Sequence, residues 1–415
     1  MSRLVVVVLL GALTSACGCG GGGSSAPVNN SNGGGNVGGG GNGNSVPLTV
    51  DSGPAGLGFI SSDVAFADVT LCVPGTNNCQ TIDHVAVDTG SSGLRILQSL
   101  VTLPLAQEEN LVECFQLVDG FTWGPVVMAD VRIAGEMASN IPIQAIGESS
   151  FPSIPSACQN SVPGAGSEDT LNDLGANGLL GISSAVRDCG SFCTGPSSLY
   201  FSCPTASTCS ETSVSLVQQP PNPVAMFASD NNGVLVQLPA IASATGESSA
   251  AGTLLFGIGT QANNGLGGAT VFHLDQFGNF TTVYNNQSYP GSFLDSGSNG
   301  IFFLTTQLTG MPDTNCGGAG GEWYCPVNPT PFATTTEGTT GSEAADFNAE
   351  SVNILFNTAN TAFNDVTGPN PTCFVNSNTS APCFDWGLPF FFGRNVFVAI
   401  EGQNTPAGTG PFWAY

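Results

Sequence analysis

Short stretches in which hydrophobic residues alternate with polar ones fill the chain after residue 46, and long helical periodicity is absent. Seven runs rich in Val, Ile, Phe and Thr, separated by Gly, Pro and Asn, predict β-strands. These runs cover 63–73, 81–90, 125–135, 141–148, 270–275, 280–286 and 395–402. Two other stretches, 171–187 and 343–357, predict short helices. The pattern therefore predicts a mostly-β protein.

The hydrophobic pattern also contains an internal repeat. An apolar run leads into Asp, Ser or Thr, Gly and Ser twice, in VAVDTGSSG around Asp88 and in SFLDSGSNG around Asp295. Each copy is followed by an apolar pair and a glycine, LLG ending at Gly181 and FFG ending at Gly393. The separations are 93 and 98 residues. Unrelated turns have no reason to share this layout, so we expect two similar halves.

The N-terminal segment differs from the rest of the chain. Residues 1–17 resemble a bacterial lipoprotein signal peptide, in which an apolar run ends at TSAC and Cys17 carries the lipid. Residues 18–46 are almost all Gly, Asn and Ser, which predicts a flexible tether. Gly18 after the cysteine favours sorting to the outer membrane. We therefore expect an outer-membrane lipoprotein of a Gram-negative bacterium, periplasmic or cell-surface, held to the membrane by its lipid only.

The cysteines beyond the tether favour disulfides. Their number is even, most are close neighbours in sequence, and an export signal implies an oxidising compartment. The neighbours are Cys72 and Cys79, Cys189 and Cys193, Cys203 and Cys209, Cys316 and Cys325, and Cys373 and Cys383, with Cys114 and Cys158 left over. A zinc site built from the four cysteines at 189, 193, 203 and 209 is an alternative interpretation of the same spacing.

The charge balance excludes some partners. The chain has 30 acidic residues, five Arg and no Lys, and its formal net charge is −25. Such a surface repels phosphate, so nucleic acid and anionic membrane surfaces are not expected partners. The chain has only two histidines: His84 is predicted at an exposed strand start and His273 in a structural role. The zinc motif H-E-x-x-H and the nucleophile motif G-x-S-x-G are absent.

The two aspartate loops and the segments after them resemble those of the pepsin-like aspartic proteases, from about residue 50 onward. More narrowly, the chain is similar to a group of uncharacterised proteobacterial lipoproteins related to pepsins. The resemblance implies a bilobal, mostly-β fold with two pseudo-twofold-related β-barrel-like lobes and a cleft between them. The expected N-terminal lobe is 47–230, with a Cys-rich insert at 183–230, and the C-terminal lobe is 231–415.

The implied activity is that of an aspartic endopeptidase. Two close carboxylates cannot both ionise, so Asp88 and Asp295 would share one proton, and one would activate water while the other acts as acid. The resemblance gives supporting roles to the residues after each aspartate, which are Thr89, Gly90, Ser91, Ser296, Gly297 and Ser298. The expected partner is an extended peptide or an unfolded protein. No cofactor or metal is expected, and the protein is expected to be a monomer.

Two features depart from the family pattern. Family members carry a flap Tyr before a Gly, and Trp123 with Gly124 is the candidate here. Arg95 stands where an aromatic residue is common. The departures leave a second hypothesis open, a catalytically inactive pepsin-like surface lipoprotein that binds a peptide, protein or glycan. A structural surface lipoprotein is a third.

Overall fold

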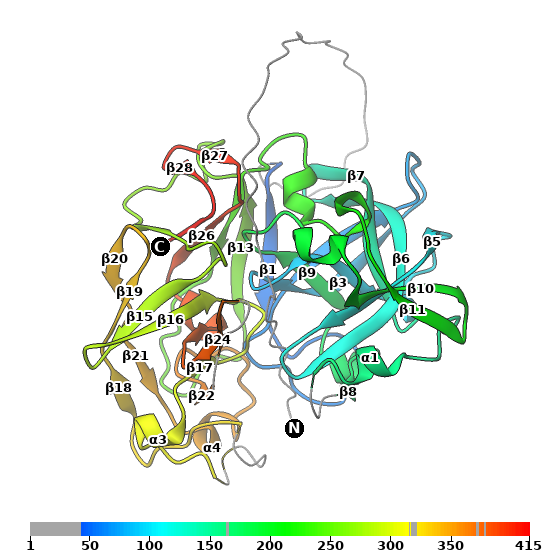
Figure 1. Ribbon diagram of the computed structural model, residues 1–415. Coiled ribbons are helices and arrows are strands. Elements are labelled where there is room, and N and C mark those ends of the chain that lie inside the picture. Colours follow the sequence, from blue (N-terminus) through cyan, green and yellow to red (C-terminus); the bar gives the residue numbers. More distant parts are fainter. Residues whose placement is uncertain (1–42, 163–165, 315, 317–321, 371–372, 377–378) are drawn as a thin grey trace.

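The computed structural model describes residues 43–162, 166–314, 316, 322–370, 373–376 and 379–415. The predicted signal peptide, Cys17 and most of the predicted tether lie outside these ranges. Two lobes flank a shared region containing β1, β13 and β26 (Figure 1). The mostly-β, bilobal prediction is confirmed.

Among the described residues, eleven strands precede the predicted lobe boundary at 230/231. They are β1 (Ser45–Val50), β2 (Ala65–Cys72), β3 (Cys79–Asp88), β4 (Ser92–Leu97), β5 (Ala106–Gln116), β6 (Gly120–Ile133), β7 (Glu136–Ile146), β8 (Gly166–Ser167), β9 (Gly178–Ile182), β10 (Ser197–Thr205) and β11 (Thr208–Thr212). In the described part of this half, β2, β3, β9, β4, β7 and β6 pair in a ring, because β6 also pairs with β2. The first lobe is therefore a closed six-stranded barrel.

The remaining strands follow that boundary. They are β12 (Gly233–Gln237), β13 (Ala250–Phe256), β14 (Val271–His273), β15 (Phe280–Tyr284), β16 (Gln287–Leu294), β17 (Ile301–Phe303), β18 (Thr330–Phe332), β19 (Thr334–Glu337), β20 (Ser342–Ala344), β21 (Phe347–Ala349), β22 (Thr367–Pro369), β23 (Cys373–Asn376), β24 (Thr379–Ala381), β25 (Asp385–Trp386), β26 (Asn395–Ala399), β27 (Asn404–Thr405), β28 (Gly408–Thr409) and β29 (Phe412–Ala414). Each of the seven runs predicted as strands overlaps an observed strand.

Helices are short throughout the described ranges. They are α1 (Ser156–Gln159), α2 (Leu171–Leu174), α3 (Thr306–Thr309), α4 (Val352–Leu355) and α5 (Leu388–Phe391), with 3-10 turns η1 (Gln98–Leu100), η2 (Gly190–Thr194), η3 (Leu216–Gln218) and η4 (Pro223–Met226). Each of the two stretches predicted to hold a short helix has one, α2 in the first and α4 in the second, while β9 also lies in the first, and β21 and most of β20 lie in the second. No helix in the described part of the chain is both long and apolar enough to cross a membrane.

The lobes are joined by a continuous antiparallel ladder. β1 pairs with β2 of the first lobe and, over all six of its residues, with β13 of the second. β12 then pairs with β13 and β26. β1 begins two residues before the predicted start of the first lobe at 47, so the end of the predicted tether is part of the sheet.

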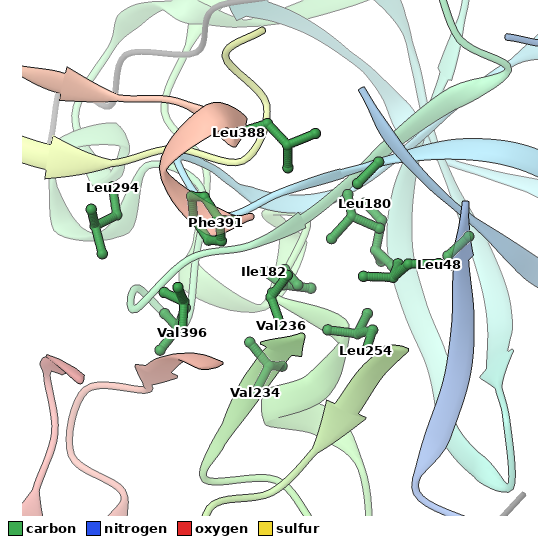
Figure 2. Packing of buried hydrophobic residues seen from close by; sticks show 14 of the residues in the cluster. Leu48, Leu180, Ile182, Val234, Val236, Leu254, Leu294, Leu388, Phe391 and Val396 are labelled. Atoms are coloured by element: carbon green, nitrogen blue, oxygen red, sulfur yellow. The ribbon is translucent and has the colours of Figure 1, made fainter. Parts of the chain in front are cut away.

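The largest hydrophobic cluster crosses the boundary between the lobes. Figure 2 shows Leu48 of β1 and Leu180 of β9 near Val234 and Leu254 of the joining ladder, with Phe391 of α5 on the other side. All five side chains are at most 1% exposed. Burying a Leu, Val or Phe side chain stabilises a fold by about 1.5–3 kcal/mol. The strands that lead to the aspartate loops are therefore anchored in one rigid core.

Candidate active site

Both aspartates lie at the carboxyl ends of strands. Asp88 is the last residue of β3, and Asp295 directly follows β16. β3 runs parallel to β9, and β16 runs parallel to β25. Each aspartate loop therefore leaves its own lobe beside a parallel partner strand, which is the same local architecture twice.

Glycine two residues after each aspartate holds the inner carboxylate oxygen. The Gly90 N–H donates to Asp88 Oδ1 at 2.7 Å, and the Gly297 N–H donates to Asp295 Oδ1 at 2.8 Å. A Cβ on Gly90 would lie 2.6 Å from Asp295 Oδ1, and one on Gly297 would lie 2.9 Å from Asp88 Oδ1. Because each loop tip touches the carboxyl group of the other lobe, both positions need glycine.

The serines three residues after each aspartate contact the outer oxygens, but they differ in their surroundings. The Ser91 hydroxyl donates to Asp88 Oδ2. Ser298 Oγ lies 3.0 Å from Asp295 Oδ2 and 2.7 Å from Oδ2 of a further carboxyl group, that of Asp385. The backbone hydrogen bonds of the two loops are therefore alike, but the second loop has the further carboxyl group of Asp385 beside it.

Hydroxyl groups bond the two loops to each other. The Thr89 hydroxyl donates to the carbonyl of Leu294 at 3.3 Å, and the Ser296 hydroxyl donates to the carbonyl of Val87 at 2.6 Å. Each oxygen also accepts from the N–H of the other residue, at 2.9 Å for Thr89 Oγ1 and 3.1 Å for Ser296 Oγ. These four bonds are buried and fix the relative position of the loops.

The carboxyl groups of Asp88 and Asp295 hydrogen-bond to each other, and both side chains are 0% exposed. Burial raises the pKa of Asp88, and hydrogen bonds from Ser91 and Asp295 offset part of that rise. Burial raises the pKa of Asp295 well above its usual range, and the nearby carboxylate of Asp88 raises it further. Because two such close carboxyl groups cannot both ionise, the pair shares one proton.

The strand beside Asp295 corrects one element of the predicted repeat. By the pairing of β16 with β25, Gly387 occupies the place that Gly181 occupies beside β3. The assignment of Gly393 to this place was wrong. The true separation from Asp295 is 92 residues, closer to the 93 of the first half. The acidic residue Asp385, two residues before Gly387, interrupts the apolar pattern that precedes Gly181 in the first half. The correspondence between Gly387 and Gly181 is therefore not visible in the sequence.

Arg95 is the centre of a buried charged group that sequence reasoning missed. Its Nη2 lies 2.7 Å from Glu113 Oε1 of β5 and 3.3 Å from Asp188 Oδ2 of the Cys-rich insert. The Tyr200 hydroxyl donates to Asp188 Oδ2 at 2.5 Å. Burial, and then the negative charge of Glu113, raise the pKa of Asp188 well above its usual range. The insert is thus bound to the barrel through Arg95, which lies between Glu113 and Asp188.

Trp123 does not lie at the tip of the β-hairpin that would form a flap. Its side chain is 2% exposed, packs against Phe201 and the Cys114–Cys158 disulfide, and donates from Nε1 to the carbonyl of Phe151 at 2.9 Å. Gly124 follows it within β6, where a Cβ would lie 1.8 Å from the carbonyl of Ala145. The tip of the β5–β6 hairpin lies at 117–119 instead. The flap assignment was therefore wrong, because these residues are part of the core.

Each histidine has polar neighbours in the fold. His84 Nδ1 lies 2.7 Å from Asp83 Oδ2 and its Nε2 lies 3.4 Å from Asp51 Oδ2, and its side chain is 25% exposed. His273 Nδ1 lies 2.8 Å from Thr340 Oγ1. Neither histidine contacts the aspartate pair in these interactions.

The predicted cysteine neighbours are paired as disulfides. The bonds are Cys72–Cys79, Cys114–Cys158, Cys189–Cys193, Cys203–Cys209, Cys316–Cys325 and Cys373–Cys383. The four cysteines of the zinc alternative are therefore engaged in two disulfides. Within the described ranges, no cluster of three or more His, Cys, Asp or Glu side chains is arranged to hold a metal ion.

Comparison with known proteins gives a fold and a family. The crystal structure of the aspartic proteinase from Irpex lacteus superposes with a TM-score of 0.52, covering 89% of this chain and 96% of that one at 14% identity. No curated protein matches the sequence. The profile of one family, described as "Protein of unknown function (DUF3443)", matches residues 40–415.

Proposed function

The chain belongs to the family described as Protein of unknown function (DUF3443), and we propose that it is an aspartic-type endopeptidase. The observation that carries the proposal is the hydrogen bond between the carboxyl groups of Asp88 and Asp295, each presented by an equivalent loop. The fold it shares with an aspartic proteinase supports the proposal.

The geometry assigns the two chemical roles. Asp88 accepts two backbone N–H bonds, from Gly90 and Ser91, and one from the Ser91 hydroxyl, so it is the better stabilised anion and acts as the general base toward water. Asp295 holds the proton and gives it to the carbonyl oxygen of the scissile bond. Since both groups act in one step, the mechanism needs a single proton on the pair. The substrate is a peptide in extended conformation, bound as an added strand.

One observation favours a second candidate, a binding protein without activity. Asp88 and Asp295 are both 0% exposed, and Gly90 beside them is only partly exposed. An endopeptidase must open this site to admit water and peptide. A binding protein that takes a peptide, protein or glycan elsewhere on its surface has no such need.

Cleavage of an unfolded protein decides between the two. The mature chain is mixed with a denatured protein from about pH 3 to pH 7, the range in which a carboxyl pair holds one proton. We expect cleavage, and inhibition by a peptide whose scissile bond is replaced by a hydroxyl-bearing group. Absence of cleavage at every pH, with retained binding of such a peptide, would establish the binding protein instead.

We also propose that Cys17 is lipidated and that the protein is held at the outer membrane, on its periplasmic or cell-surface side. The support is the apolar run before Cys17 and the Gly-, Asn- and Ser-rich residues after it. Cys17→Ser is expected to move the protein from the membrane fraction to the soluble fraction after cell lysis. Cys19→Ser, two residues further on, is the matched control and should leave it in the membrane fraction. Membrane association of the Cys17→Ser variant equal to wild type contradicts the proposal.

A further inference from the structure

A third carboxyl group lies behind the aspartate pair. Asp385 is 0% exposed in β25, where it pairs with Phe293 of β16 and Phe302 of β17. The corresponding register in the first lobe places Leu179 of β9 opposite Ala86 and Arg95. An acid thus replaces an apolar residue at equivalent positions of the two lobes.

The lobes differ in charge on either side of the pair. In the first, Arg95 is the counterpart of Phe302, and its positive charge lowers the pKa of Asp88. In the second, Asp385 is the counterpart of Leu179, and when Asp385 is ionised its charge raises the pKa of Asp295. This asymmetry favours the anion on Asp88 and the proton on Asp295.

The Ser298 hydroxyl joins Asp385 to the pair. Ser298 Oγ is within hydrogen-bond distance of Oδ2 of both Asp295 and Asp385, yet it has a single proton to donate. One of the two carboxyl groups must therefore be protonated and donate to Ser298. Asp385 Oδ1 has no hydrogen-bond partner in the described part of the chain. The titratable groups that face Asp385 are the acids Asp88 and Asp295.

A buried carboxylate with an unsatisfied oxygen and two acidic neighbours is strongly disfavoured, so at low pH Asp385 is the protonated partner. It donates to Ser298, and Ser298 donates to Asp295 Oδ2. With Oδ2 occupied as an acceptor, the proton of Asp295 is confined to Oδ1. A Cβ on Gly297 would lie 3.0 Å from Asp295 Oδ1 and 2.9 Å from Asp88 Oδ1, so both Oδ1 atoms face the tip of the second loop.

We propose that Asp385 is a positioning residue that, through Ser298, holds the shared proton on the inner oxygen of Asp295 and keeps it there toward neutral pH. If Asp385 loses its own proton first, its negative charge makes loss of the proton from Asp295 less favourable. The consequence for catalysis rests on the proposed function, whereas the effect on protonation does not.

The test is a titration of the aspartate carboxyl carbons by NMR, using the mature full-length chain labelled at aspartate. We expect Asp385→Asn to lower the pH at which the Asp88–Asp295 pair loses its last proton by about one unit or more. Asp385→Leu places the residue type of position 179 there and is expected to shift the titration in the same direction. Asp365→Asn removes another second-lobe carboxyl, whose burial raises its pKa to about 6, and should leave the pair unchanged.

The pH dependence of kcat gives a second measurement, in which the alkaline limb should move to lower pH by the same amount. A titration of the pair that is identical in wild type and both Asp385 variants overturns the inference, even if the wild type cleaves peptides. A shifted titration in a protein that cleaves nothing supports the inference and refutes the proposed peptidase. Loss of activity in Asp385→Leu without a pH shift would assign Asp385 a packing role and also overturn it.

Discussion

Asp88→Asn and Asp295→Asn are each expected to lower kcat/KM for peptide cleavage by about 10⁴-fold or more, because each removes one of two roles that act in the same step. Losses from residues that act as a unit are far from additive. The double variant should therefore be hardly slower than either single one. The measurement is cleavage of a peptide substrate at the acidic pH optimum of the wild type.

The same two substitutions should raise the free energy of unfolding relative to the wild type as pH rises. Burial raises the pKa of both carboxyl groups, so the folded state binds more protons than the unfolded state as pH rises above about 4. The free energy of unfolding therefore falls as pH rises toward the folded-state pKa values of the pair. Asn does not titrate, so each Asn variant should lose less stability over this pH range than the wild type.

Asp365→Asn is the control for the activity measurement, since Asp365 lies outside the site. An Asn variant that keeps more than a tenth of wild-type activity would rule out the shared-proton mechanism.

Arg95→Met is expected to lower the free energy of unfolding by about 3–5 kcal/mol, because it leaves Glu113 as a buried anion without its cation. Arg95 and Glu113 have side chains that are 0% and 1% exposed, so water cannot replace the lost contact. Denaturant unfolding at pH 7 measures the loss. Arg394→Met is the matched control, because Arg394 stacks on Phe390 and bonds its carbonyl. Arg394→Met should lower the free energy of unfolding by about 1 kcal/mol.

The destabilisation by Arg95→Met should depend on pH. Without Arg95, Asp188 loses the positive charge that lowers its pKa, so the folded state takes up a proton at Asp188 more readily. A carboxyl group with a raised pKa in the folded state stabilises most at low pH, so the deficit should shrink as pH falls toward about 4. A deficit that is constant from pH 4 to about 7 would show that lost packing of the Arg95 side chain, whose guanidinium lies over the Phe115 ring, is responsible and not the loss of the ion pair.

Local patterns were sufficient to predict the aspartate loops, the seven strands and the close cysteine pairs. An Asp, a hydroxyl residue and a Gly in adjacent positions specify the loop whatever surrounds it. Trp123 was misjudged because its burial depends on Phe201, 78 residues away, and on a disulfide with a long loop. No local pattern encodes such a contact.

Asp385 and Arg95 escaped prediction for a different reason. Each places a charge on a buried strand, where a periodicity argument expects an apolar residue. Of their partners, Ser298 comes from the second aspartate loop, Glu113 from β5, and Asp188 from an insert without recognisable pattern. Strand register and tertiary packing bring them together, and the register also identified Gly387 in place of Gly393.

The strand next to the predicted tether determines where the chain can be shortened. The Gly43 carbonyl accepts from Gly135 in the first lobe, and the Asn44 backbone and side chain bond Phe256 in the second. A polypeptide beginning at residue 47 would lose these hydrogen bonds. It would also lose Ser45 and Val46 and expose the edge of β13 with which these two residues pair. A secreted variant freed from the membrane should therefore begin before residue 43. A pulling force transmitted along residues 18–42 would act on the seam between the lobes.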